Sequence, residues 1–132
     1  MKLQIDMPWE RDLSVNHCRM GPKGNWHLKS HVESWMKELE QWVWFERRVI
    51  NGDDRLPDPW PPDLTLPVKI VVDFRFPSNR KIDDHNLYYV IANSVAAGLG
   101  IDDKDLRIST GTVEVDRERP GFTITVSDAQ ND

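Results

Sequence analysis

The sequence predicts a small α/β (α+β) protein in which a small mixed β-sheet carries two helices on one face, in the order β-α-β-α-β-β. Three observations lead to this fold class. Residues 68–76 alternate apolar and polar side chains with the period of two of a half-buried strand. Residues 30–49 and 83–98 instead repeat their apolar side chains at helical spacing. Strand-like stretches precede the first helix and follow the second.

The first predicted strand covers residues 1–7, where apolar and polar side chains alternate until Pro8 ends the pattern. Residues 9–29 are polar and are interrupted by glycine and proline. They contain several basic and histidine side chains, so we predict a long basic loop between the first strand and the first helix.

The first helix is predicted from Ser30 to about Val49, because Ser30 and Glu33 form a capping box ahead of an apolar stripe that includes Trp35 and Trp42. These two tryptophans are therefore expected in the core. The five prolines of residues 51–67 exclude helix and central strand, which predicts an ordered loop at the edge of the fold.

The strand over residues 68–76 is the clearest in the sequence, and a short basic turn separates it from the second helix. That helix is predicted to end at Gly98, since glycine commonly follows the last helical turn. Two final strands are expected over residues 105–126, joined by a turn near residues 119–121.

The chain has 132 residues, which predicts one domain over residues 1–127 followed by a polar tail over 128–132. Its single cysteine, Cys18, cannot form an internal disulfide, and no apolar run reaches the length of a signal peptide or a membrane span. We therefore expect a cytoplasmic protein without a membrane partner. The net charge of −5 argues against a polyanionic partner, although acidic residues that hold metal cations are neutralised by them.

Two acidic pairs, Asp83-Asp84 and Asp102-Asp103, flank the second predicted helix. The pattern alone favours capping and turn chemistry at each helix end. The alternative is a divalent-metal site. A helix of a dozen residues is about 18 Å long, so the two pairs meet only if the chain after Gly98 doubles back along the sheet.

These residues resemble a known family, the RusA-like Holliday-junction resolvases, which are small endodeoxyribonucleases common in phages and prophages. The family pattern is an Asp-x-Asp-Asn at a helix start, a Lys three residues later, and a Gly-x-x-x-Asp-Asp about a dozen residues further on. Here "DDHN" places Asp83 and Asn86 in register, and "GLGIDD" supplies Gly98, Asp102 and Asp103. The stretches "LPVKIVVDFRFP" and "LSVNHCRM" are similar to the preceding strand and to the family's first loop. The resemblance covers nearly the whole chain, from about residue 3 to residue 126.

The resemblance implies a homodimer that hydrolyses phosphodiesters near the crossover of a four-way DNA junction. The reaction would depend on Mg²⁺ and would give paired symmetric nicks during DNA recombination and repair. Asp83 and Asp103 carry over onto catalytic positions of the family, and Asp102 onto the acidic neighbour. The alternative partner is another form of branched DNA.

Two positions depart from the family pattern, because its second Asp falls on His85 and its Lys falls on Tyr89. The metal ligands are therefore Asp83 and Asp103 with either Asp84 or His85, and an imidazole ligand would favour Mn²⁺ over Mg²⁺. Loss of the lysine removes a positive charge from the reaction. Lys81 or Arg80 must then compensate, or the protein is a catalytically impaired binder of branched or structured nucleic acid.

Contacts with DNA are expected from side chains of the first loop, of the turn before Asp83 and of the helix start. These are Asn16, Arg19, Lys23, Lys29, Arg80, Lys81 and Asn86. Solvated surface charge is the alternative for each cation. His27 and His31 lack partner ligands at zinc-site spacing, so no zinc site is predicted. A weaker alternative is a phage assembly or interaction protein that needs no metal.

Overall fold

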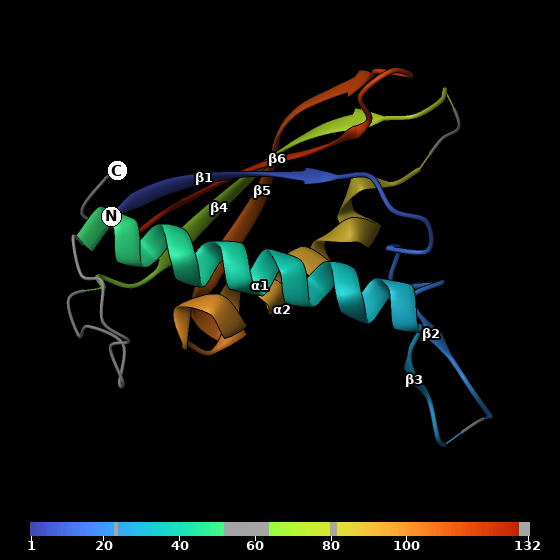
Figure 1. Cartoon of the computed structure of the whole chain (residues 1–132), viewed down its shortest axis with the longest axis horizontal. Coiled ribbons are helices and arrows are strands. Elements are labelled where there is room, and N and C mark those ends of the chain that lie inside the picture. Colours follow the sequence, from blue (N-terminus) through green and yellow to red (C-terminus); the bar gives the residue numbers. More distant parts are fainter. Residues whose placement is uncertain (23, 52–63, 80–81, 130–132) are drawn as a thin grey trace.

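The computed structural model describes residues 1–22, 24–51, 64–79 and 82–129, and its centre is a four-stranded mixed sheet (Figure 1). The strands are β1 (Lys2–Pro8), β4 (Val68–Phe76), β5 (Leu106–Val115) and β6 (Gly121–Ser127), in the spatial order β1-β6-β4-β5. β4 and β5 are parallel, whereas β6 pairs antiparallel with both β1 and β4. The predicted α/β fold class is confirmed.

Both long helices lie on the same face of this sheet, as predicted (Figure 1). α1 (Ser30–Asn51) packs against β1 and against α2 (Tyr88–Leu99). α2 connects β4 to β5, and a crossover of this kind is what allows two consecutive strands of a sheet to be parallel. No helix in the described part of the chain combines the length and apolar character needed to cross a bilayer.

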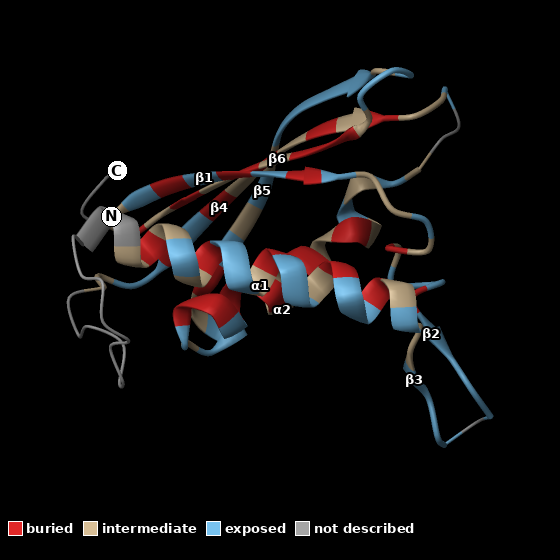
Figure 2. Ribbon diagram, in the orientation of Figure 1, coloured by how far each residue is buried: buried red, intermediate tan, exposed pale blue. Residues whose placement is uncertain are grey.

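The core fills the space between the sheet and the helices, where the buried residues of both layers meet (Figure 2). An aromatic cluster at one end of it includes Trp9, whose ring stacks 5.4 Å from that of Phe122. Trp35 packs edge-on against Phe122 and donates a hydrogen bond to the Pro8 carbonyl at 2.8 Å. These contacts fix the point where the chain leaves β1. Trp42, in contrast, is 44% exposed, so its predicted place in the core is wrong.

The structure refines the expected elements in two places. The predicted basic loop contains a hairpin of two short strands, β2 (Arg19–Met20) and β3 (His27–Leu28), which are too short to show a sequence period. The second helix continues past Gly98 to Leu99, and Gly100 ends it with a left-handed φ of 70°. Residues 52–63 of the proline-rich stretch lie outside the described residues.

Asp128, which the sequence assigned to the polar tail, is buried beside the start of β1. Its carboxylate accepts hydrogen bonds from the Met1 nitrogen at 2.9 Å and from the Thr65 backbone N–H at 3.1 Å. Ala129 continues this contact through its backbone N–H to the Thr65 carbonyl. The fold therefore includes at least these two residues beyond β6.

Candidate functional site

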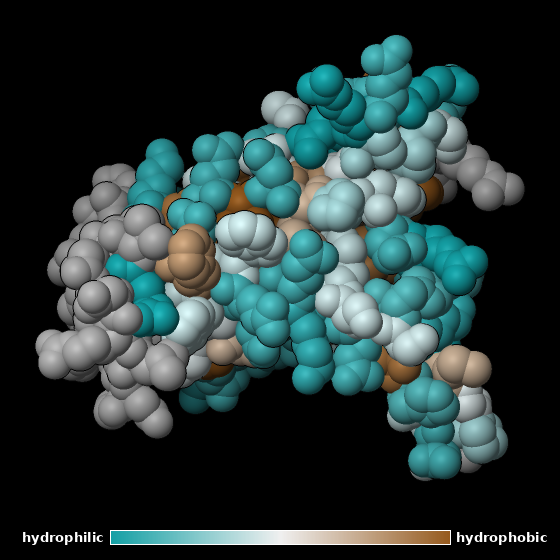
Figure 3. Space-filling model, in the orientation of Figure 1, coloured by the Kyte–Doolittle hydropathy of each residue, from teal (hydrophilic) through white to brown (hydrophobic). Residues whose placement is uncertain are grey.

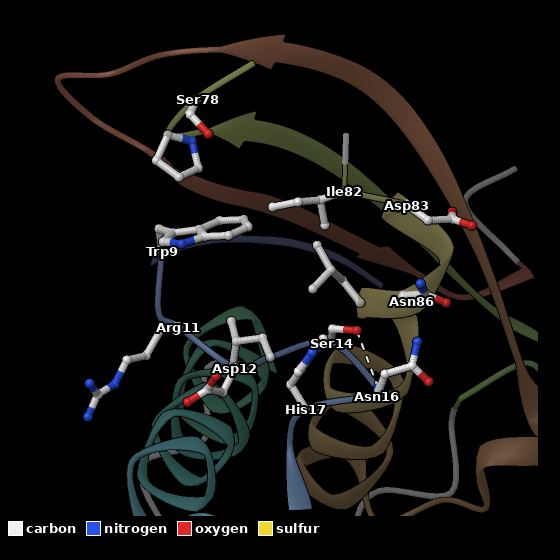
Figure 4. Close-up of a pocket in the computed structure, with 13 residues that line it drawn as sticks. Trp9, Arg11, Asp12, Ser14, Asn16, His17, Ser78, Ile82, Asp83 and Asn86 are labelled. Atoms are coloured by element: carbon white, nitrogen blue, oxygen red, sulfur yellow. Dashed lines mark hydrogen bonds between the residues drawn. The ribbon is translucent and has the colours of Figure 1, made fainter. Parts of the chain in front are cut away.

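An open cleft of about 550 Å³ lies between the first loop and the segment that joins β4 to α2. Its walls come from residues within 9–17, 77–78 and 82–87 (Figure 4). The lining residues are Trp9, Arg11, Asp12, Leu13, Ser14, Asn16, His17, Pro77, Ser78, Ile82, Asp83, Asn86 and Leu87. The cleft therefore joins three residues that the sequence singled out, namely Asn16, Asp83 and Asn86.

The first loop is tied directly to the helix start across this cleft. The Val15 backbone N–H donates to the Asn86 carbonyl at 2.8 Å. The loop then closes on itself, because the backbone N–H of Cys18 donates to the Ser14 carbonyl at 2.9 Å and Cys18 is fully buried. Asn16 is exposed and lies on the same side of the cleft as Asn86 and Asp83, with Trp9 on the other side (Figure 4).

Asp12 connects the loop to the start of α1. Its carboxylate Oδ2 lies 2.9 Å from His31 Nε2 and 3.5 Å from Lys29 Nζ. Burial raises the pKa of Asp12, but the hydrogen bond with His31 and the charge of Lys29 outweigh it, and the pKa falls below its ordinary value. Asp12 also has a left-handed φ of 65°, a conformation that Asp and Asn tolerate better than most residues.

We expect Asp12→Asn to destabilise the protein by about 1 kcal/mol, because it removes a partly exposed charge-assisted pair while keeping the left-handed backbone. A folded-state pKa below the unfolded one means that the stabilisation is complete above about pH 4 and is lost as the pH falls through the folded pKa. Urea unfolding at pH 7 and at pH 3 should thus show a difference between wild type and variant that shrinks at pH 3. A constant difference would assign the effect to shape and not to charge.

Asp83 begins the acidic end of α2. It precedes a 3₁₀ turn, η1 (Asp84–Leu87), and its Oδ1 accepts a hydrogen bond from the His85 backbone N–H at 2.9 Å. The capping interpretation is therefore confirmed, although the capped element is a 3₁₀ turn ahead of the α-helix. One carboxylate oxygen serves as the cap, so the other remains for a ligand in the exposed cleft.

The side chains of the next two residues, Asp84 and His85, have different contacts. Asp84 accepts a hydrogen bond from the Thr110 hydroxyl of β5, and Thr110 also contacts the Tyr88 hydroxyl. The His85 side chain is 72% exposed, lies 4.0 Å from an Asp84 oxygen, and stacks on the Tyr88 ring with centroids 4.9 Å apart. Asp84 is thus oriented by a contact with the sheet, whereas the His85 side chain lies exposed against the Tyr88 ring.

The second acidic pair lies at the opposite end of α2 (Figure 1). Asp102 Oδ1 accepts a hydrogen bond from the Lys104 backbone N–H at 3.1 Å and caps η2 (Asp103–Asp105), which confirms the capping interpretation here also. That hydrogen bond and a second one with the Asp103 side chain lower the pKa of Asp102. The chain does return along the sheet, as β5, but the residue that it brings to the first acidic pair is Thr110. Asp102 and Asp103 stay at the far end of α2.

The type and spacing of these side chains can be compared with what a divalent metal ion requires. The carboxylate oxygens at both ends of α2 are the donor type that Mg²⁺ prefers. Within the described residues of a single chain, however, no three His, Cys, Asp or Glu side chains converge to hold an ion. One chain therefore offers Asp83 at the cleft and Asp84 beside it at Thr110, and leaves Asp103 a helix length away.

The basic residues predicted to contact DNA differ in their surroundings, and the sequence did not indicate these differences. Arg19 lies over the Tyr89 ring, with its guanidinium carbon 4.8 Å from the ring centroid, and donates a hydrogen bond to the Tyr89 hydroxyl. A cation from β2 is thus present where the family pattern has its lysine. Lys29 is paired with Asp12. The predicted contacts Lys23, Arg80 and Lys81 lie outside the described residues.

Arg11, His17 and Ser78 also line the cleft but were not among the predicted site residues. Each lies in an irregular segment, where no period relates a residue to its neighbours in space. Only the topology, which places the ends of β1 and β4 at the same end of the sheet with β6 between them, brings these residues together. A search against protein-family models and a search of curated proteins found no match to the chain.

Proposed function

We propose that the protein is a metal-dependent endodeoxyribonuclease that cuts branched DNA, with a four-way junction as substrate and paired symmetric nicks as product. The observation that carries this proposal is the cleft shared by Asn16, Asp83 and Asn86, which come from two distant parts of the sequence. The resemblance to RusA-like resolvases assigns the same residues to one function. Mg²⁺, or Mn²⁺ in its place, would be the cofactor.

Each residue of the proposed site has a chemical task. A bound divalent ion supplies charge neutralisation at the phosphate and a nucleophilic water at neutral pH. Asp83 and Asp84 are the residues that would hold it, and the contact with Thr110 keeps the Asp84 carboxylate oriented. Arg19, held over Tyr89, replaces the family's lysine as the local positive charge. Asn16 and Asn86 offer amide donors and acceptors to the DNA backbone.

Asp103 can take part only if a second copy of the chain supplies it. In a single chain α2 (Tyr88–Leu99) separates it from Asp83, and a helix of that length spans about 18 Å. A two-fold dimer in which each cleft receives Asp103 from the other subunit would complete a carboxylate set at two equivalent sites. Two such sites also suit a substrate that must be nicked symmetrically.

Cleavage of an end-labelled four-way junction tests the proposal. We expect paired nicks from the wild type with Mg²⁺ or Mn²⁺, none in EDTA, and a loss of about 100-fold or more in Asp103→Asn. Asp105→Asn, in the same 3₁₀ turn, is the matched control and should cleave normally. Cleavage that survives in Asp103→Asn would remove this residue from the site, and no cleavage by the wild type with either metal would overturn the proposed activity.

A second candidate is a protein that binds branched or structured nucleic acid without cutting it. Two observations favour it: His85 stands where the family has a carboxylate, and the described residues of one chain contain no group of three metal-binding side chains. Junction binding by the wild type with no nicks under either metal would support this candidate over the nuclease.

A further inference from the structure

The β2–β3 hairpin extends away from the sheet and helices at the end of the molecule that carries the cleft (Figures 1 and 3). It exposes two large apolar side chains, Trp26 and Met20, which are 64% and 52% exposed. An indole so far in solvent buries little surface and contributes little to folding. Its position therefore calls for a role in binding.

The hairpin holds Trp26 in a defined place. Met20 pairs with His27 across the two strands, and the Asn25 backbone N–H donates to the Pro22 carbonyl at 2.9 Å within the turn. Gly21 has a φ of 116°, and a Cβ there would lie only 2.6 Å from the Asn25 carbonyl oxygen. These contacts of Gly21, Pro22 and Asn25 position the tryptophan, which lowers the entropic cost of binding through it.

Charge around the hairpin indicates the partner. No acidic residue occurs between Asp12 and Glu33, although the chain as a whole has a net charge of −5. The same segment contains three lysine or arginine residues and three histidines. A segment that combines an exposed aromatic side chain with basic residues and no acidic ones matches single-stranded nucleic acid, whose bases stack on aromatic rings while its phosphates attract positive charge.

We infer that Trp26 stacks on an unpaired base of DNA, such as one exposed at a branch point, while Arg19 and its basic neighbours face the phosphates. The inference rests on the proposed function for its choice of DNA. The hairpin base is anchored beside the cleft, since Lys29 donates its backbone N–H to the carbonyl of buried Cys18 and Arg19 contacts Tyr89 of α2. A base held by Trp26 would thus belong to the same DNA molecule that reaches Asp83.

Affinity measurements in EDTA test this stacking without any cutting of the DNA. The probes are a four-way junction, a short single strand and a duplex of equal length. We expect Trp26→Ala to weaken binding of the junction and the single strand by about 5- to 100-fold and to leave duplex binding unchanged. Trp26→Phe should restore most of the lost affinity. Tryptophan emission of the wild type should be quenched by the single strand, and Trp26→Ala should lose that quenching.

Trp42→Ala is the matched control, because Trp42 is also exposed, at 44%, but lies on α1 away from the hairpin. It should bind all three probes like the wild type. Equal affinities for wild type and Trp26→Ala, an equal loss in Trp42→Ala, or no DNA binding by the wild type would each overturn the inference. A wild type that binds the single strand through Trp26 yet never nicks a junction would retain the inference and refute only the nuclease.

Discussion

A mixture of Asp83→Asn and Asp103→Asn subunits is expected to cut a four-way junction although each variant alone is inactive. If every cleft combines Asp83 of one subunit with Asp103 of the other, a mixed dimer contains one intact site and one doubly altered site. Random mixing gives about half mixed dimers, so about a quarter of the wild-type sites should return. The products should be single nicks and not paired ones, since a mixed dimer has one working site.

The reason for this expectation is the geometry of α2, which keeps the two residues apart within one chain. Both substitutions should preserve the fold, because Asp83 and Asp102-Asp103 are exposed and asparagine is as good a cap as aspartate. Subunits must be unfolded and refolded together to exchange. Mixing each variant with itself is the control. A mixture that stays as inactive as its components, while the wild type cuts, would mean that the subunits do not share their sites.

The sheet and its helices were predictable because their signals are local. β4 alternates buried and less buried side chains along its whole length, and the predicted and observed bounds of that strand agree. The predicted start of α1 at Ser30 is also the observed one, and the helix continues two residues past the predicted end, to Asn51. Side chains at these spacings are fixed by the geometry of one strand or one helix, so no knowledge of the rest of the chain is needed.

The cleft was only partly predictable, for a physical reason. Asn16, Asp83 and Asn86 were identified through the resemblance, and no period in the sequence relates the first loop to the start of α2. The contact between them depends on a backbone hydrogen bond from Val15 and on the tertiary packing of Trp9. The contact between Arg19 and Tyr89 was likewise not predictable, because it joins a two-residue strand to a helix.

Gly98→Ala is expected to destabilise the protein by about 2 kcal/mol, which corresponds to a fall in melting temperature of about 8 °C. Alanine is intrinsically better than glycine inside a helix by about 1 kcal/mol, so propensity alone predicts the opposite sign. Close packing of α2 against α1 at this residue outweighs the helix propensity. A Cβ at residue 98 would lie 2.6 Å from the Glu40 carbonyl oxygen and 2.8 Å from the Val43 Cβ, both on α1.

Ala97→Ser is the matched control for thermal melting, because it adds one heavy atom at the adjacent but exposed position and should shift the melting temperature little. A Gly98→Ala variant as stable as the wild type would mean that α1 and α2 do not touch at this point. Close helix packing therefore explains why Gly98, the glycine of the Gly-x-x-x-Asp-Asp pattern, has no side chain, and this explanation is independent of metal chemistry. Because α2 follows directly from the η1 turn, a helix forced away from α1 would also shift η1 and the Asp83 cap that precedes it.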